Sequence, residues 1–174
     1  MIALVTGGAS SGKSEYAEQL AESMTARPLY YVATMAATDP ESLARINAHR
    51  ARRAGQGYET LECYTGLSAL LLPERGTVLL DCIGNLCANE LFAPNGAGEG
   101  ACDAICTGVQ TLAAQCENLI LVTNEVGSGG TNYSPETRHY MEVLGTVNQF
   151  LAKQSDLVVE VLCGLPKFWK GELQ

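Results

Sequence analysis

The chain has 174 residues, of which 47% are hydrophobic and 17% charged, and its formal net charge is −8. This length and composition predict a single globular domain, residues 1–174, with a substantial core. The acidic balance argues against nucleic-acid binding, which needs a basic face toward the phosphate backbone. The expected target is therefore a small molecule.

The cysteines and the apolar runs indicate the cellular compartment of the protein. Seven cysteines are present, an odd number, and none forms a C-x-x-C pair, which argues against a disulfide framework and a tetrahedral zinc site. The chain starts on an apolar strand-like run rather than a signal peptide, and no apolar run approaches the roughly 20 residues that span a bilayer. We expect a cytoplasmic protein without a membrane span.

The segment after the first expected strand, residues 2–5, carries the clearest motif. Residues 7–14 match the pattern G-x-x-x-x-G-K-[ST], and a helix is expected over residues 13–24. This strand–loop–helix context is what the pattern requires, and it disfavours a glycine-rich turn without a ligand. Backbone N–H groups and the helix N-terminus would face the phosphates of a nucleoside triphosphate. The predicted phosphate-binding residues are Gly7, Gly8, Ala9, Ser10, Ser11, Gly12, Lys13 and Ser14.

The rest of the chain alternates apolar runs with helical patterns. Strands are expected at residues 29–34, 77–82, 119–124 and 157–162, with a weaker one at 58–63, and helices at 40–53, 102–116 and 135–153. Residues 95–100 are expected to form a glycine-rich loop. The alternation predicts an α/β fold of the P-loop, RecA-like NTPase type, with a mostly parallel central sheet and helices on both faces. Ligands of such sheets bind at the carboxyl ends of the strands.

Asp81 ends one of these strands and is the candidate magnesium carboxylate. It follows the apolar run Val78-Leu79-Leu80. In P-loop proteins such an acid holds Mg²⁺ opposite the hydroxyl of the loop, here Ser14, while Lys13 reaches the β- and γ-phosphates. An aspartate in an ordinary turn is the alternative, and the position at a strand end disfavours it.

The helix over residues 40–53 brings a basic segment into an acidic chain. Arg45, His49 and Arg53 share one face by their four-residue spacing, with Arg52 beside them. Arginine forks suit phosphate oxygens, so a second anion site is one interpretation, and a solvated basic helix is an equally good one. A neutral imidazole at His49 could attack an α-phosphorus and form a phosphoramidate, and neighbouring cations would help to keep it unprotonated. A lone histidine is nevertheless more often a surface or hydrogen-bonding residue.

The segment that follows the strand at residues 119–124 is a candidate substrate loop. Asn124 and Glu125 precede a glycine-rich run at residues 127–130, at the edge of the sheet where functional loops gather. A plain turn into the next helix is the alternative.

These motifs together resemble the bifunctional adenosylcobinamide kinase / adenosylcobinamide-phosphate guanylyltransferase family over nearly the whole chain. The P-loop is shared with a vast class of proteins, whereas the histidine–arginine stretch and the Thr-Asn-Glu-Val-Gly run are far more specific. The matching segments are residues 5–14, Tyr31-Val32-Ala33-Thr34, Arg45-Ile46-x-x-His49-Arg50-x-x-Arg53, Leu80-Asp81-Cys82, Val122-Thr123-Asn124-Glu125-Val126-Gly127, Leu144-Gly145-x-x-Asn148-Gln149 and Gly164-Leu165-Pro166.

The resemblance implies two reactions. A nucleoside triphosphate, ATP or GTP, phosphorylates the aminopropanol hydroxyl of adenosylcobinamide. GTP then gives GMP to His49 with release of pyrophosphate, and adenosylcobinamide phosphate attacks that adduct to give adenosylcobinamide-GDP. The resemblance also implies Mg²⁺ at Ser14 and Asp81, a catalytic role for Lys13, and a homo-oligomer, with a trimer favoured. The further nucleotide contacts that it implies are Ala33, Thr34, Met35, Arg50, Ala51, Arg52, Arg53, Glu62 and Asp81.

The chain departs from the family pattern at two places, and two other functions stay open. Many members read Gly-Ile-Val-Pro where this chain has Gly129-Gly130-Thr131-Asn132, and some carry a second histidine at the position of Ala48. A single-activity P-loop kinase would form no covalent nucleotide. A non-catalytic nucleotide-dependent regulator would show only slow hydrolysis. The sequence does not decide whether ATP or GTP is the kinase donor.

Overall fold

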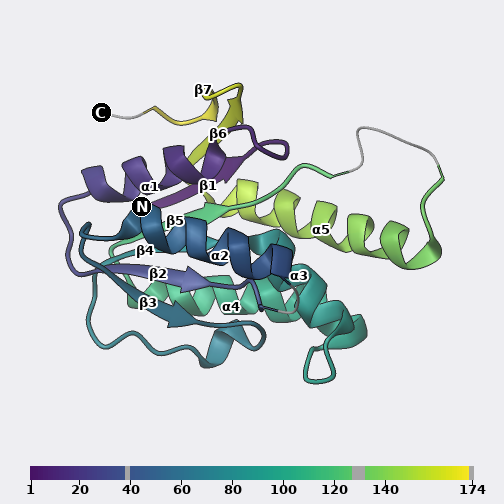
Figure 1. Ribbon diagram of the computed structural model, residues 1–174. Helices are drawn as coiled ribbons and strands as arrows, with labels where there is room; N and C mark the ends of the chain where they lie inside the picture. Colours follow the sequence, from purple (N-terminus) through teal and green to yellow (C-terminus); the bar gives the residue numbers. More distant parts are fainter. Residues whose placement is uncertain (38–39, 127–131, 173–174) are drawn as a thin grey trace.

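The computed structural model describes residues 1–37, 40–126 and 132–172. Its strands form one seven-stranded sheet in the order β3-β2-β4-β5-β1-β6-β7 (Figure 1). All neighbours from β3 to β6 are parallel, and β7 is antiparallel to β6. The strands are β1 (Ile2–Thr6), β2 (Leu29–Ala33), β3 (Tyr58–Glu62), β4 (Thr77–Asp81), β5 (Asn118–Val122), β6 (Leu157–Leu162) and β7 (Leu165–Lys170).

Helices cover both faces of the sheet. They are α1 (Lys13–Ser23), α2 (Pro40–Arg53), α3 (Ile83–Phe92), α4 (Ala101–Gln115) and α5 (Pro135–Gln154), with the short 3₁₀ turns η1 (Leu67–Ala69) and η2 (Gly98–Gly100). Because successive strand residues point to opposite faces, Leu4 packs in the cluster that α3, α4 and α5 complete, whereas Ala3 and Val5 pack against α1. The predicted α/β fold with helices on both faces is confirmed.

The predicted strands and helices all form, with ends that differ by one or two residues. The strand expected at 29–34 ends at Ala33, and the helix expected at 102–116 is Ala101–Gln115. The expected loop at residues 95–100 contains the 3₁₀ turn η2. In the described residues, no helix is both long and apolar enough to cross a membrane.

Helix α3 was not expected from the sequence. Its sequence, IGNLCANELF, contains glycine and two asparagines, which are weak helix formers. Packing decides the outcome, because Ile83, Leu86 and Cys87 are fully buried between the sheet and the neighbouring helices. The buried Glu90 also ties α3 to the adjacent loops by accepting from the backbone N–H groups of Gly66 and Ala97.

Strand β7 was also missed, because nothing in its pattern indicates a buried face. All six of its residues are exposed, and it includes Pro166. A two-residue turn creates the hairpin: Cys163 and Gly164 have φ of 51° and 78°, the left-handed pair of a hairpin turn whose twist matches that of the strands. The Gly164 N–H donates to the Ser11 carbonyl oxygen at 2.8 Å, so this hairpin supports the phosphate loop.

Candidate functional site

The loop between β1 and α1 has the glycine requirements of a phosphate cradle. A Cβ at Gly7 would lie 2.5 Å from the carbonyl oxygen of Val161, and Gly12 adopts φ 92° with Gly164 Cα 3.2 Å from its Cβ position. Neither position accepts a side chain without displacement of backbone. The Lys13 amine donates to the Gly8 carbonyl oxygen at 3.0 Å, so its charge lies over the loop at the start of α1.

Asp81, at the carboxyl end of β4, faces two other functional side chains. Its Oδ2 accepts a hydrogen bond from the Tyr31 hydroxyl at 3.1 Å and lies 3.4 Å from His49 Nδ1. Burial and the Asp81 charge raise the pKa of Tyr31 above its usual value, so the phenol stays a hydrogen-bond donor. Asp81 is only 10% exposed, and its position at a strand end is the one the sequence indicated.

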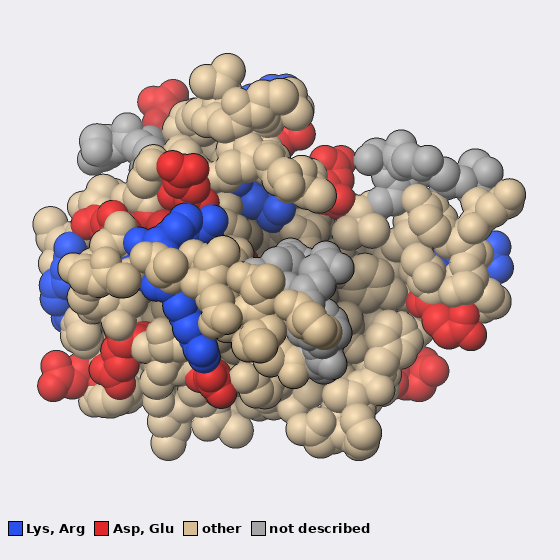
Figure 2. All heavy atoms as spheres, viewed as in Figure 1, with Lys and Arg blue, Asp and Glu red and all other residues tan. Residues whose placement is uncertain are grey.

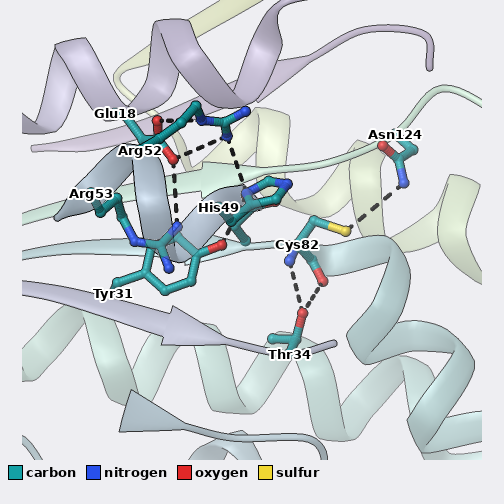
Figure 3. Close-up of polar contacts among 9 residues, drawn as sticks. Glu18, Tyr31, Thr34, His49, Arg52, Arg53, Cys82 and Asn124 are labelled. Carbon is teal, nitrogen blue, oxygen red and sulfur yellow. Dashed lines mark hydrogen bonds and ion pairs between the residues drawn. The ribbon is translucent and has the colours of Figure 1, made fainter. Parts of the chain in front are cut away.

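Helix α2 presents its basic residues to a carboxylate of α1 (Figure 3). The Glu18 carboxylate accepts from Arg52 Nε at 3.3 Å and Arg52 Nη2 at 3.2 Å, and Arg53 Nη1 lies 3.5 Å away. The Arg53 guanidinium also stacks over the Tyr31 ring, 3.3 Å from its centroid. Sequence reasoning missed Glu18, because an acid among the apolar positions of α1 gives no indication of its partner until the fold is known.

His49 is held as a neutral imidazole in this cluster. Its pKa is lowered, first by burial, which outweighs the raising effect of Asp81, and further by the positive charge of Arg52. Arg52 Nη2 lies 3.2 Å from His49 Nδ1 (Figure 3). The expectation that neighbouring cations keep this imidazole unprotonated therefore agrees with the structure, with burial as the larger cause.

The basic residues of α2 differ in their exposure to solvent. Figure 2 shows Lys and Arg side chains in a band over the end of α2, with acidic side chains on either side. Arg50 pairs with Glu62 at 3.3 Å, and both side chains are about half exposed, at 54% and 51%. Arg53, in contrast, is buried against Tyr31 and Glu18. The side chain of Arg45 lies outside the described part.

A cleft at the carboxyl edge of the sheet collects half of the predicted site residues. The predicted residues that line it are Lys13, Ser14, Ala33, Met35, His49, Arg50, Arg53, Glu62 and Asp81. The further lining residues to which the sequence analysis gave no role include the apolar Leu43 and Ile46 and the polar Asn85. The same cleft is therefore lined by Lys13 and Ser14 of the P-loop and by His49 of α2.

Other predicted residues lie outside the lining of this cleft. Thr34 is fully buried, and its hydroxyl donates to the Cys82 carbonyl oxygen at 2.9 Å and accepts from the Cys82 N–H at 2.7 Å. It therefore joins the ends of β2 and β4. Residues 7–12, Ala51 and Arg52 are likewise absent from the cleft lining among the described residues.

Of the candidate substrate loop, residues 124–130, the structure describes only residues 124–126. Asn124 lines the cleft and its amide lies 3.9 Å from the Cys82 sulfur (Figure 3). The glycine-rich run and the departure from the family pattern at residues 129–131 fall outside the described residues.

Comparison with known proteins identifies a family for the chain. The family model of cobinamide kinase / cobinamide phosphate guanyltransferase matches residues 3–168. The bifunctional adenosylcobalamin biosynthesis protein CobU of Salmonella typhimurium is 37% identical over 95% of this chain and 97% of its own length. The corresponding protein CobP of Pseudomonas aeruginosa is 34% identical over 97% of both chains.

Solved structures show the same fold at low identity. The flagellar accessory protein FlaH of Methanocaldococcus jannaschii superposes with a TM-score of 0.53 at 16% identity, over 99% of this chain and 81% of that one. A KaiC-like protein of Pyrococcus horikoshii gives 0.50 at 14% identity, over 91% of this chain and 71% of that one. These neighbours confirm the RecA-like P-loop NTPase fold.

Proposed function

The chain belongs to the cobinamide kinase / cobinamide phosphate guanyltransferase family, and we propose that one cleft carries out both reactions. The observation that carries this proposal is the neutral His49, 3.4 Å from Asp81, in the cleft that Lys13 and Ser14 also line. A kinase alone needs the phosphate cradle and a metal carboxylate. It has no use for a partly buried, unprotonated imidazole beside them.

In the first reaction, the P-loop cradles the triphosphate. The hydroxyl of the cobinamide side chain attacks the γ-phosphorus, the bond from the γ-phosphorus to the bridging oxygen breaks, and the nucleoside diphosphate leaves. Lys13 supplies positive charge to the phosphoryl oxygens as negative charge spreads over them. This step requires positioning and electrostatic stabilisation but no covalent intermediate.

In the second reaction, His49 attacks the α-phosphorus of GTP. A P–N bond forms, the α–β bridging bond breaks and pyrophosphate leaves. Asp81 Oδ2 lies 3.4 Å from Nδ1 and can accept its proton, which leaves Nε2 as the attacking nitrogen. In this tautomer the Arg52 guanidinium, which has no acceptor, acts on the imidazole through its charge and donates its hydrogen bonds to Glu18. A phosphate oxygen of cobinamide phosphate then displaces the imidazole, the P–N bond breaks and the GDP-linked product is released.

The donor set of the cleft fits Mg²⁺. The Ser14 hydroxyl and the Asp81 carboxylate are oxygen ligands at one cleft, the kind that Mg²⁺ prefers together with substrate phosphates. The contacts of Asp81 that the structure describes use Oδ2, and Oδ1 would serve the metal directly or through water. Mg²⁺ bound there would neutralise part of the negative charge of the substrate phosphates.

We further propose a homo-oligomer, with a trimer favoured, and a cytoplasmic location. The β6–β7 hairpin exposes Leu162, Leu165, Phe168 and Trp169 at the edge of the sheet, where unpaired strand edges and apolar side chains favour association. Light scattering of the purified protein tests the oligomeric state.

The cysteines support the proposed location, because seven free thiols suit a reducing compartment. Residues 1–174 are proposed as one domain, because all seven strands share one sheet.

Product analysis tests the proposed function. The protein is incubated with Mg²⁺, adenosylcobinamide and ATP, GTP or both nucleotides together, and the products are identified by mass. We expect the phosphate ester with at least one donor and the GDP-linked product only where GTP is present. The phosphate ester alone would indicate a single-activity kinase, and nucleotide hydrolysis alone would indicate a regulator.

A further inference from the structure

The helix that carries His49 has almost no apolar anchor. Among the α2 side chains that the structure describes, only that of Arg53 is buried, and it is charged. Helix α1, by comparison, packs Ala17, Leu20 and Ala21 into the sheet. Something other than hydrophobic burial must therefore hold α2 where His49 meets Asp81.

Glu18 makes the contacts that can do so. It is a buried acid in α1, and its two carboxylate oxygens are shared by Arg52 and Arg53 of α2 at 3.2 to 3.5 Å. The Arg52 guanidinium fixes the orientation of its side chain relative to Glu18 as well as their distance, because its Nε and Nη2 bind different oxygens of the carboxylate. A carboxylate this buried is favourable only while its cationic partners stay in place.

The contacts continue from Glu18 to the reacting side chains. Arg52 Nη2, which binds Glu18, is also the atom 3.2 Å from His49 Nδ1. Arg53 stacks on Tyr31, whose hydroxyl binds Asp81. Two routes thus lead from one carboxylate to the two sides of the His49–Asp81 contact. Figure 3 shows the route from Glu18 through Arg52 to His49.

We propose that Glu18 is a positioning residue for His49, an inference that rests on the proposed function only in taking His49 as the nucleophile. Glu18 lies five residues after Lys13 on the same helix. The helix whose N-terminus cradles the phosphates therefore also docks the helix that carries the imidazole. This arrangement sets the position of the attacking nitrogen relative to the α-phosphorus, and errors of about 1 Å in such geometry cost about a hundredfold in rate.

The test compares Glu18→Gln with Glu15→Gln, which removes the same charge from an exposed position of α1. Guanylylation of the protein is followed at saturating GTP, together with the kinase step. In Glu18→Gln, we expect guanylylation to fall about tenfold to a hundredfold, with kinase activity close to that of the wild type. Glu15→Gln should match the wild type in both.

A second readout does not depend on activity. Amide hydrogen exchange over α2 is compared in the wild type, Glu18→Gln and Glu15→Gln. If Glu18 holds α2 in place, its loss should speed exchange over residues 46–53. If Glu18 contributes only charge, exchange over α2 should stay at the wild-type rate, as it should in Glu15→Gln.

The outcomes separate the inference from the proposed function. A wild-type guanylylation rate in Glu18→Gln, or unchanged hydrogen exchange over α2, would overturn the positioning role. If the wild-type protein forms no adduct, the proposed function fails, and the hydrogen exchange of α2 still decides whether Glu18 holds this helix. Glu18→Asp keeps the charge and shortens the side chain, so it serves if Glu18→Gln does not fold. The positioning role predicts a loss of guanylylation in Glu18→Asp, and wild-type behaviour there would overturn it.

Discussion

Helices α1 and α2 both border the cleft, yet they are held in opposite ways. The buried face of α1 includes Leu20 and two alanines packed against the sheet, so apolar burial fixes the helix that begins at the phosphate loop. Helix α2 is docked by two arginines that share Glu18. Apolar burial tolerates small changes of angle, whereas a forked ion pair has one favourable geometry.

This difference separates the two chemical tasks. In the proposed mechanism, the kinase step depends on the cradle and therefore on α1. The guanylyl transfer would depend in addition on where α2 places His49. Substitutions in the cradle should consequently affect both reactions, and substitutions in the contacts of α2 should affect the second reaction selectively.

The largest effect is expected from Lys13→Ala. It removes the point charge that both reactions need at the phosphates, so both rates should fall by about 10²–10³-fold or more. Steady-state assays of each step measure this, with the exposed Lys153→Ala as a matched control. A variant that kept either rate near the wild-type value would show that the two reactions do not share the cradle.

Asp81→Asn should lower both rates by about 10–100-fold and raise the Mg²⁺ concentration needed for half-maximal activity. The amide keeps the shape but loses the charge that faces His49 and that we propose for the Mg²⁺ site. The titration of activity with Mg²⁺ checks this, beside Asp103→Asn, which changes an exposed acid on α4. An unchanged Mg²⁺ dependence would leave Asp81 a structural or nucleotide-contacting residue only.

Arg52→Gln should shift the pH dependence of guanylylation. The attacking imidazole must be neutral, and burial and Arg52 lower the pKa of His49, so the wild-type rate should be lost only below the ordinary histidine value of about 6.5. Without the Arg52 charge the pKa rises, and the acid limb of the pH–rate profile should move to higher pH. Arg138→Gln, at an exposed position, is the control. Identical acid limbs in the wild type and Arg52→Gln would contradict this account.

The stability of the two regions should differ in a measurable way. Leu20→Ala opens a cavity beneath α1 and should lower the free energy of unfolding by about 2–5 kcal/mol. Arg50→Gln breaks the exposed pair with Glu62 and should change it by no more than about 1 kcal/mol. Urea unfolding curves of the three proteins test this. Equal losses would mean that the exposed pair contributes far more than its exposure allows.

The sequence predicted α1 and its loop better than it predicted α2. The P-loop is a contiguous motif, and Asp81 follows a contiguous apolar run, so local pattern was enough to place Lys13, Ser14 and Asp81 at one cleft. The face of His49, Arg52 and Arg53 followed from helical spacing, but their partners did not. Glu18 and Tyr31 acquire their roles only when α1, α2 and β2 come together in the fold.

The elements that were missed have the same physical explanation. Helix α3 forms because Ile83 and Leu86 are buried, against the preference of its glycine and asparagines. Strand β7 forms through its turn and its pairing with β6, with every side chain exposed. Neither long-range packing nor strand pairing leaves a local pattern in the sequence.

The direct test of the central claim is the mass of the protein after incubation with Mg²⁺ and GTP. We predict the addition of one GMP on His49, in an acid-labile, alkali-stable bond typical of a phosphoramidate. The adduct should be absent from His49→Ala, which should still phosphorylate adenosylcobinamide, and present in His139→Ala. An adduct that persists in His49→Ala, or a wild-type protein that phosphorylates adenosylcobinamide but gains no GMP, would contradict the account.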